Sequence, residues 1–160
     1  MKELRKDYVK GLKRYEGDCY YWGGESPKGI DCSGLIRRGL IDSLFLRGVR
    51  TLDPGLVRKA IWVWWHDCTA KDLLDGNGFT QPLLAVKSLN ELDSSKIQPG
   101  DLAVTSWGSH VMAYLGDNCW IEADPGVGRV VVVTAPSKEN LWFHCTMKLV
   151  RWHLLGDGQI

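Results

Sequence analysis

The stretch Gly29-Ile30-Asp31-Cys32-Ser33-Gly34-Leu35 joins a loop rich in turn-forming residues to a segment with helical periodicity. An apolar stripe follows it at helical spacing, formed by Ile36, Leu40 and Leu44. Cys32 is therefore predicted to stand at the N-terminus of a helix. Such an end favours a negative charge and offers free backbone amides, so the position suits a thiolate nucleophile and a developing oxyanion. The small residues Ser33 and Gly34 would let a substrate carbonyl approach.

A cysteine at a helix start is by itself weak support for catalysis, because free cysteines are commonly buried and inert. A thiolate nucleophile needs an imidazole base, and His110 opens an alternating segment that carries Met112 and Tyr114 on the same face. A hairpin centred on Gly116 would place Glu122 directly opposite His110, where a carboxylate can orient the imidazole. The other three histidines are interpreted as surface or core-edge residues: His66, His144 and His153.

The order of elements predicts an α+β domain. Helical patterns cover residues 1–16, the segment from Cys32 to about Gly48, and residues 53–75. Short strand patterns follow at 102–105, 111–115, 120–123, 129–134 and 141–150, the last with alternating apolar residues from Leu141 to Leu149. Helices followed by a meander of strands favour an antiparallel sheet with helices packed against it. No linker or repeat divides the chain, so residues 1–160 are expected to form a single domain.

Two separated blocks of sequence resemble the NlpC/P60 peptidases. The first block runs from Tyr20-Tyr21-Trp22-Gly23-Gly24 to Gly29-Ile30-Asp31-Cys32-Ser33-Gly34-Leu35, and the second joins Pro99-Gly100-Asp101-Leu102, His110-Val111-Met112-Ala113-Tyr114-Leu115-Gly116 and Trp120-Ile121-Glu122-Ala123. The resemblance implies a papain-like fold, with N-terminal helices on a five- to six-stranded antiparallel sheet. It also implies Cys32 as nucleophile, His110 as base and Glu122 in the third catalytic position.

The resemblance places further residues of the first block at the site. Tyr20 matches the tyrosine of the nucleophile motif, which implies a place in the active site and help to the oxyanion. Trp22 and Ser33 are assigned to the same oxyanion and substrate-binding group. The sequence departs from the family at Glu122, since the third position is usually His and sometimes Asn or Gln. It departs again in the length of the stretch from Gly48 to Pro99.

The activity implied by the resemblance is that of a thiol peptidase that hydrolyses peptidoglycan stem peptides. The bond is often the one between γ-D-glutamate and a diamino acid, and the reaction passes through a thioester acyl-enzyme. Two alternatives remain open. A papain-like amidase or acyltransferase would use the same cysteine and histidine on another amide or ester. A phage tail or assembly module would carry the site as a vestige.

Composition limits the partners. Apolar residues make up 44% and charged residues 24% of the 160 residues, and the net charge of +1 does not favour nucleic acid. The five cysteines form no C-x-x-C pair, so neither a zinc ribbon nor a thioredoxin-like site is expected. We expect no metal or other cofactor, and most cysteines are expected to be reduced and buried. No signal peptide or membrane span is evident. We therefore expect synthesis in the cytoplasm and delivery to the wall by a phage, holin or secretion route. A phage lysin, a phage tail enzyme or a toxin would be delivered in this way. The alternative is an enzyme that trims recycled wall peptides inside the cell.

The segment 53–75 holds Trp62, Trp64 and Trp65, which cannot all share one face of a helix. Tryptophan is highly buried on average, so we expect these side chains mainly in packing contacts. A wall of a substrate groove is the alternative. The oligomeric state is not indicated by the sequence.

Overall fold

The computed structural model describes residues 2–156, and its helical part lies on the N-terminal side of the chain. The α-helices are α1 Lys2–Lys13, α2 Cys32–Thr51, α3 Pro54–Trp65 and α4 Ala70–Asp75. Side chains cap three of them at the N-terminus, as the sequence favours: Asp31 for α2, Asp53 for α3 and Thr69 for α4. Within residues 2–156, no helix combines the length and apolar character needed to cross a bilayer.

The strands form one six-stranded antiparallel sheet and one small hairpin. The large sheet has the order β3-β8-β4-β5-β6-β7, and every neighbouring pair is antiparallel. Its strands are β3 Thr80–Val86, β4 Leu102–Thr105, β5 Val111–Gly116, β6 Cys119–Asp124, β7 Arg129–Thr134 and β8 Met147–Trp152. The hairpin of β1 Glu25–Ser26 and β2 Gly29–Ile30 precedes α2. The predicted α+β architecture is therefore confirmed.

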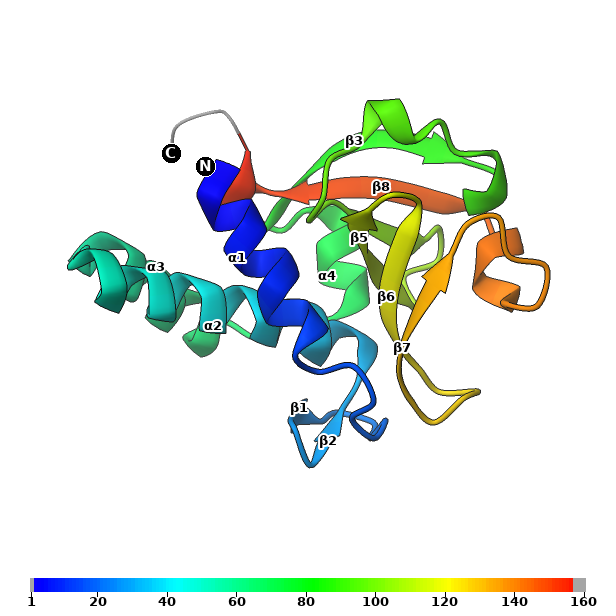
Figure 1. Ribbon diagram of the computed structural model, residues 1–160. Coiled ribbons are helices and arrows are strands. Elements are labelled where there is room, and N and C mark those ends of the chain that lie inside the picture. Colours follow the sequence, from blue (N-terminus) through cyan, green and yellow to red (C-terminus); the bar gives the residue numbers. More distant parts are fainter. Residues whose placement is uncertain (1, 157–160) are drawn as a thin grey trace.

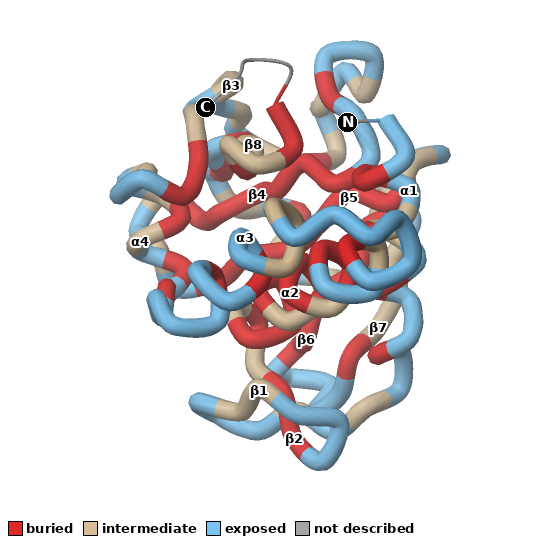
Figure 2. Tube along the Cα trace, turned by 90° about the vertical axis from the view of Figure 1, so that its left-hand side faces the viewer, coloured by how far each residue is buried: buried red, intermediate tan, exposed pale blue. Residues whose placement is uncertain are grey.

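The sheet separates two apolar clusters. Helices α1, α2 and α4 lie against one face, as Figure 1 shows, and the larger cluster forms there. The other face carries a smaller cluster around Trp120, Phe143 and Leu149, covered by short 3-10 turns at Leu89–Glu91 and Leu141–His144. Buried residues gather in β4, β5 and β6 between these layers (Figure 2). Strand β6, which carries Glu122, and strand β5, which begins directly after His110, thus belong to the most buried part of the protein.

The sequence analysis missed one strand of the sheet and wrongly assigned part of another. The strand it missed is β3. The predicted strand 141–150 is a 3-10 turn at Leu141–His144 followed by β8, which begins only at Met147. The side chain of Asn140 accepts a hydrogen bond from the Trp142 amide at 2.9 Å, so it caps the turn and favours it over extended backbone. The segment 135–146 therefore crosses the sheet face instead of joining the sheet.

The predicted hairpin register was wrong by two residues, while the predicted face was right. Ala113 pairs with Ile121 and Tyr114 with Trp120, so the turn is centred on Asp117 and its neighbour rather than on Gly116. Asp117 has φ 51° and the next residue φ 59°, as a tight two-residue hairpin turn requires. Since side chains alternate with a period of two, a shift of two residues keeps them on the same face.

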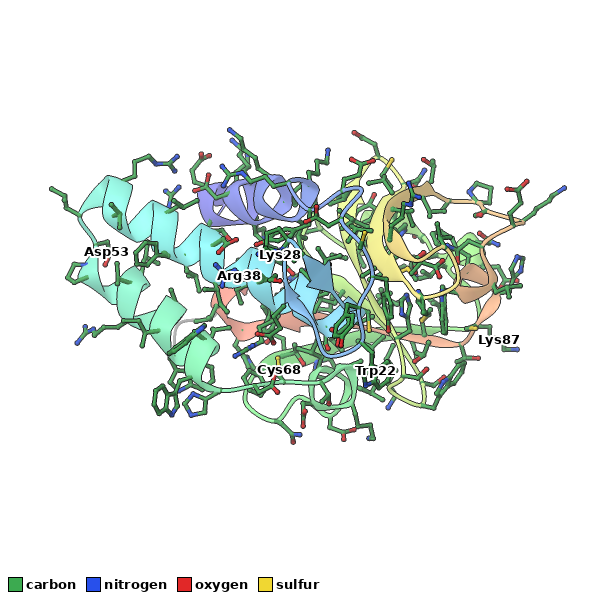
Figure 3. All side chains as sticks on the ribbon, turned by 90° about the horizontal axis from the view of Figure 1, so that it is seen from below. Trp22, Lys28, Arg38, Asp53, Cys68 and Lys87 are labelled. Atoms are coloured by element: carbon green, nitrogen blue, oxygen red, sulfur yellow. The ribbon has the colours of Figure 1, made fainter. Side chains whose placement is uncertain are left out.

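Helices α2 and α3 form a hairpin that projects from the fold (Figure 1). Asp53 lies at its outer end, away from Trp22 in the view of Figure 3. Exposed fractions of 43%, 55% and 75% for Trp62, Trp64 and Trp65 contradict the expectation that they mainly pack. The buried residues of α3 are Ala60 and Val63 instead.

A buried ion-pair cluster explains the acidic residue that follows Pro99-Gly100. The Asp101 side chain is fully buried and accepts two hydrogen bonds of 2.7 Å from Arg151 on β8. Arg5 on α1 adds a contact of 3.3 Å. Asp101 therefore joins α1 to the sheet beside β4, and this motif residue is structural.

Candidate active site

The two motif blocks meet in a cleft of about 580 Å³ between the start of α2 and the end of the sheet. Its lining includes all the predicted site residues except Glu122, which lies behind His110: Tyr20, Trp22, Cys32, Ser33 and His110. Two residues that line the cleft, Trp22 and Cys68, are labelled in Figure 3 and show where the cleft lies. The structure thus brings the predicted residues together from segments about 80 positions apart in the chain.

Cys32 is the first residue of α2, and Asp31 fixes its position. The Asp31 carboxylate accepts hydrogen bonds from the Gly34 amide at 2.7 Å and the Gly23 amide at 2.9 Å. It also accepts the Ser33 hydroxyl hydrogen bond at 3.0 Å. This cap joins the glycine-rich loop to the helix, so the thiol of Cys32 stands at the positive end of a helix of 20 residues.

His110 and Glu122 form a buried pair behind the thiol. The His110 Nε2 and Glu122 Oε2 atoms are 2.5 Å apart, and the two residues are 1% and 0% exposed. Because of the register, Glu122 lies opposite Met112, which makes it the diagonal neighbour of His110 rather than its direct partner. Diagonal neighbours on one face lie within reach of long side chains, so the predicted contact is present despite the wrong register.

The surroundings of His110 favour its protonated form. Burial alone would lower its pKa, but hydrogen bonds and charges from Cys32 and Glu122 outweigh burial and raise the pKa from 6.5 to about 9. An imidazolium held between a thiol and a carboxylate stabilises the thiolate. The arrangement can therefore supply a nucleophile and a general acid at neutral pH.

Asn140 is a functional candidate that sequence reasoning missed. Its Nδ2 donates a hydrogen bond of 2.5 Å to Glu122 Oε1, so both oxygens of this buried carboxylate have partners. Its Oδ1 accepts from the Trp142 amide at 2.9 Å. The indole of Trp142 stacks on the His110 ring, with centroids 4.1 Å apart and planes at 17°. One short segment therefore orients the carboxylate and covers the imidazole.

A sequence signal for this segment exists. The turn-forming run Ala135-Pro136-Ser137-Lys138-Glu139-Asn140 precedes Leu141, and Asn is a favoured cap before a helical turn. The alternating apolar residues that follow match a strand pattern, so the sequence predicted a strand at 141–150 instead of a turn capped by Asn140.

The three predicted oxyanion and substrate residues line the cleft in different ways. Tyr20 is partly buried, and burial, followed by the charges of Cys32 and Asp31, raises the pKa of its phenol. A protonated phenol beside the thiol can donate to an oxyanion. Trp22 is 81% exposed and forms the outer edge. The Ser33 hydroxyl already donates to Asp31, so its direct contact with substrate stays a prediction.

The remaining cysteines differ more in exposure than the sequence indicated. Cys68 is buried in the cleft wall, Cys19 is exposed, and Cys119 and Cys145 are partly buried. The expectation that most of the other four are buried was therefore wrong. Within residues 2–156, no group of three or more His, Cys, Asp or Glu side chains is arranged to hold a metal ion.

Comparisons with known proteins agree with this geometry. No family model matches the chain. A dipeptidyl-peptidase 6 from Lysinibacillus sphaericus is 27% identical over 139 residues, which cover 87% of this chain and 40% of that protein. The solved structure of the peptidoglycan hydrolase RipB from Mycobacterium tuberculosis is 19% identical with a TM-score of 0.56, covering 91% of this chain and 64% of that one. An NLP/P60 family protein from Staphylococcus aureus is 23% identical with a TM-score of 0.57, covering 94% and 42%.

The chain thus has the fold of the NlpC/P60 proteins, and the resemblance read from its motifs is confirmed at the level of the fold. It spans about 40% of the length of the curated relative that it matches.

Proposed function

We propose that this protein is a cysteine peptidase that hydrolyses peptidoglycan stem peptides, at the bond between γ-D-glutamate and a diamino acid. The observation that carries the proposal is the buried chain of contacts Asn140–Glu122–His110, together with the interaction of His110 with Cys32, the first residue of α2. These contacts support an imidazolium on His110 that stabilises a thiolate on Cys32.

The reaction follows from the roles of these groups. The Cys32 thiolate attacks the carbonyl carbon, and the carbonyl oxygen becomes an oxyanion near the amides of the α2 N-terminus and the phenol of Tyr20. His110 then gives its proton to the leaving amine, and the C–N bond breaks to leave a thioester on Cys32. Water, deprotonated by His110, attacks the thioester and releases the acid and the free thiol.

The substrate class is supported by the fold and by the names of similar proteins. RipB is named a peptidoglycan hydrolase, and the relative from Lysinibacillus sphaericus is named a dipeptidyl-peptidase. For this chain, the bond cleaved, the thioester and the endopeptidase mode belong to the proposal. A wall target further implies delivery across the membrane by a phage, holin or secretion route, unless the substrates are recycled wall peptides inside the cell.

An acyltransferase is the second candidate, because the same thioester yields a new amide when an amine replaces water. A module with a vestigial site is less well supported. A site that no longer works has no need for a buried carboxylate with both oxygens hydrogen-bonded and directed at an imidazole.

The test is digestion of defined muropeptides followed by mass spectrometry, with Cys32→Ala as the inactive control. Hydrolysis adds one water and gives two peptides split at the γ-D-glutamyl bond. A product joined to an added amine would indicate the transferase. Intact substrate under all conditions would contradict both enzymes.

A further inference from the structure

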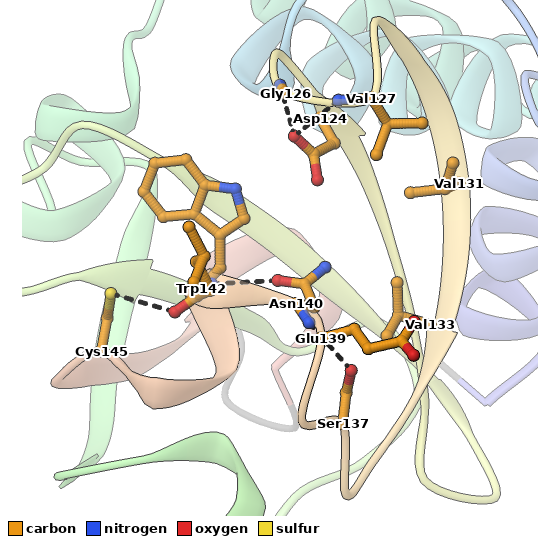
Figure 4. A pocket seen from close by; sticks show the side chains of 11 residues that line it. Asp124, Gly126, Val127, Val131, Val133, Ser137, Glu139, Asn140, Trp142 and Cys145 are labelled. Carbon is orange, nitrogen blue, oxygen red and sulfur yellow. Dashed lines mark hydrogen bonds between the residues drawn. The ribbon is translucent and has the colours of Figure 1, made fainter.

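A second groove of about 610 Å³ lies beside the edge strand β7 (Figure 4). One wall is formed by Val131 and Val133, which are half-buried on β7, and Val133 also packs against the smaller apolar cluster. The opposite wall comes from that segment, including Glu139 and Trp142. None of the residues assigned to the bond-breaking steps lines this groove.

Trp142 joins this groove to the catalytic cleft. It is part of the lining of both, and its indole stacks on the His110 ring. Pro125 lines the cleft, while its neighbours Asp124 and Gly126 line the groove. The groove therefore adjoins the catalytic cleft at Trp142.

The groove lies on the side of the leaving group. In the proposed reaction His110 must reach the nitrogen of the leaving amine to protonate it. The acyl part of the substrate stays with Cys32 and the loop of Tyr20. The part that departs therefore occupies the side of His110, where Trp142 marks the entrance to the groove.

The lining combines an apolar wall with negative charge. Val127 and Leu141 extend the apolar lining beyond the two valines. Their side chains are 56% and 79% exposed. Glu139 is exposed, and its side chain points toward Val133 in Figure 4. Asp124 supplies a second carboxylate, with one oxygen bound to the Gly126 amide at 2.6 Å. None of the lining residues in the described part of the chain is basic.

We propose that this groove binds the side chain of the diamino acid on the leaving-group side, through an aliphatic stem against the valines and a primary ammonium at Glu139. Methylene groups of a lysine-type side chain bury well on apolar surface while the charged end stays at a polar rim. The inference rests on the proposed peptidase function and adds a preference to it. The enzyme selects stem peptides whose side-chain amine is free over peptides in which that amine is acylated by a cross-link.

The experiment compares two synthetic peptides, L-Ala-γ-D-Glu-L-Lys-D-Ala and the same peptide with the lysine ε-amine acetylated. The kcat/KM of each is measured by product analysis for the whole protein. The free amine should be preferred about two- to fivefold, the range for one solvent-exposed ion pair.

Substitutions in the groove test whether the preference for the free amine depends on the charge of Glu139 and on the apolar wall. Glu139→Gln keeps the size of the side chain and should bring the preference close to one. Val133→Lys places a positive charge on the apolar wall and should lower kcat/KM for the free amine by about fivefold more than for the acetylated peptide. Thr134→Lys is the matched control, since it adds the same charge one residue away on the opposite face of β7. It should keep the preference of the unmodified protein.

Equal kcat/KM for the two peptides in the unmodified protein would overturn the inference and leave the peptidase intact. A preference that survives both Glu139→Gln and Val133→Lys would also overturn it. Failure to cleave either peptide would refute the proposed function itself, and the inference with it.

Discussion

Two buried cysteines line the same cleft, and they differ in their neighbours. Cys32 is the first residue of α2 and is 8% exposed, while Cys68 precedes α4 and is 2% exposed. Both therefore lie near the start of a helix, and both line the cleft. By position and burial alone, either could be taken for the nucleophile.

The charges around the two thiols separate them. Burial raises the pKa of Cys68 to about 12; the positive charge of Arg37 lowers it, but less strongly, and the carboxylates of Asp67 and Asp72 act to raise it. Cys32 instead interacts with His110, and together with Glu122 it raises the pKa of that imidazole to about 9. The proposed nucleophile is therefore distinguished from Cys68 by an imidazole that is held by a carboxylate, and not by its place at a helix start.

The largest expected effect is the loss of activity in Cys32→Ser. A serine hydroxyl is far less acidic than a thiol, so hydrolysis of the stem peptide should fall by at least about 10³-fold. Cys68→Ser is the matched control and should stay within about tenfold of the original rate, with a stability loss of about 1 kcal/mol from the buried hydroxyl. The kcat/KM and the melting curve of each variant are measured. Equal losses of kcat/KM in Cys32→Ser and Cys68→Ser would contradict the assignment of Cys32 as the nucleophile.

The second prediction removes the charge that holds the imidazolium. Glu122→Ala should lower kcat/KM by about 100-fold and Glu122→Gln by about tenfold, because only glutamine can keep part of the orientation. The loss in Glu122→Gln follows from the structure, since both carboxylate oxygens of Glu122 accept hydrogen bonds, from His110 and Asn140. An amide NH2 would have to face one of these donors.

The basic limb of the pH profile of kcat/KM should also shift when the charge of Glu122 is removed. The raised pKa of His110 means that its stabilising contact with Glu122 is complete below about pH 6.5 and is lost as the pH rises through about 9. The basic limb of kcat/KM should therefore lie near pH 9 in the unmodified protein and at lower pH in Glu122→Gln. A profile for Glu122→Ala that matches the unmodified protein would remove Glu122 from the site.

The sequence was sufficient for the contact between His110 and Glu122 but insufficient for its geometry. Alternation along two strands fixes the face on which a side chain lies, and a register error of two residues does not change that face. The exact partner depends on the turn, and the tight turn at Asp117–Asn118 centres the hairpin beyond Gly116. The direct opposition of the two residues was therefore wrong, and their contact was right.

Longer-range features could not be predicted in this way. Strand β3 is half-exposed at the far edge of the sheet, and its pairing with β8 depends on residues about 65 positions later in the chain. Asn140 reaches Glu122 because the segment before β8 turns across the sheet face. Both depend on tertiary packing, which local periodicity does not report.

The third prediction concerns Asn140 as a positioning residue. Asn140→Ala removes the hydrogen bond to Glu122 and the cap of the turn that carries Trp142, and kcat/KM should fall by about tenfold. His144→Ala, an exposed change in the same turn, should have little effect. A residue that is only structural would lower the melting temperature and leave the pH profile alone, so a basic limb shifted in Asn140→Ala distinguishes positioning from stability.

The smallest effects on kcat/KM are expected for substitutions in the projecting hairpin, because its tryptophans do not line the catalytic cleft. Trp65 is 75% exposed and lines neither groove, whereas Trp142 stacks on the imidazole of His110. Trp142→Ala should lower kcat/KM by about threefold to tenfold, since a cation over an indole is stabilised by roughly 0.5–2 kcal/mol. Trp65→Ala should keep kcat/KM within about twofold and the melting temperature within about 2 °C, because exposed substitutions usually change stability by less than about 0.5 kcal/mol. A rise in KM for Trp65→Ala without loss of stability would instead place the hairpin along the path of a longer substrate, which is the groove-wall role considered for these tryptophans from the sequence.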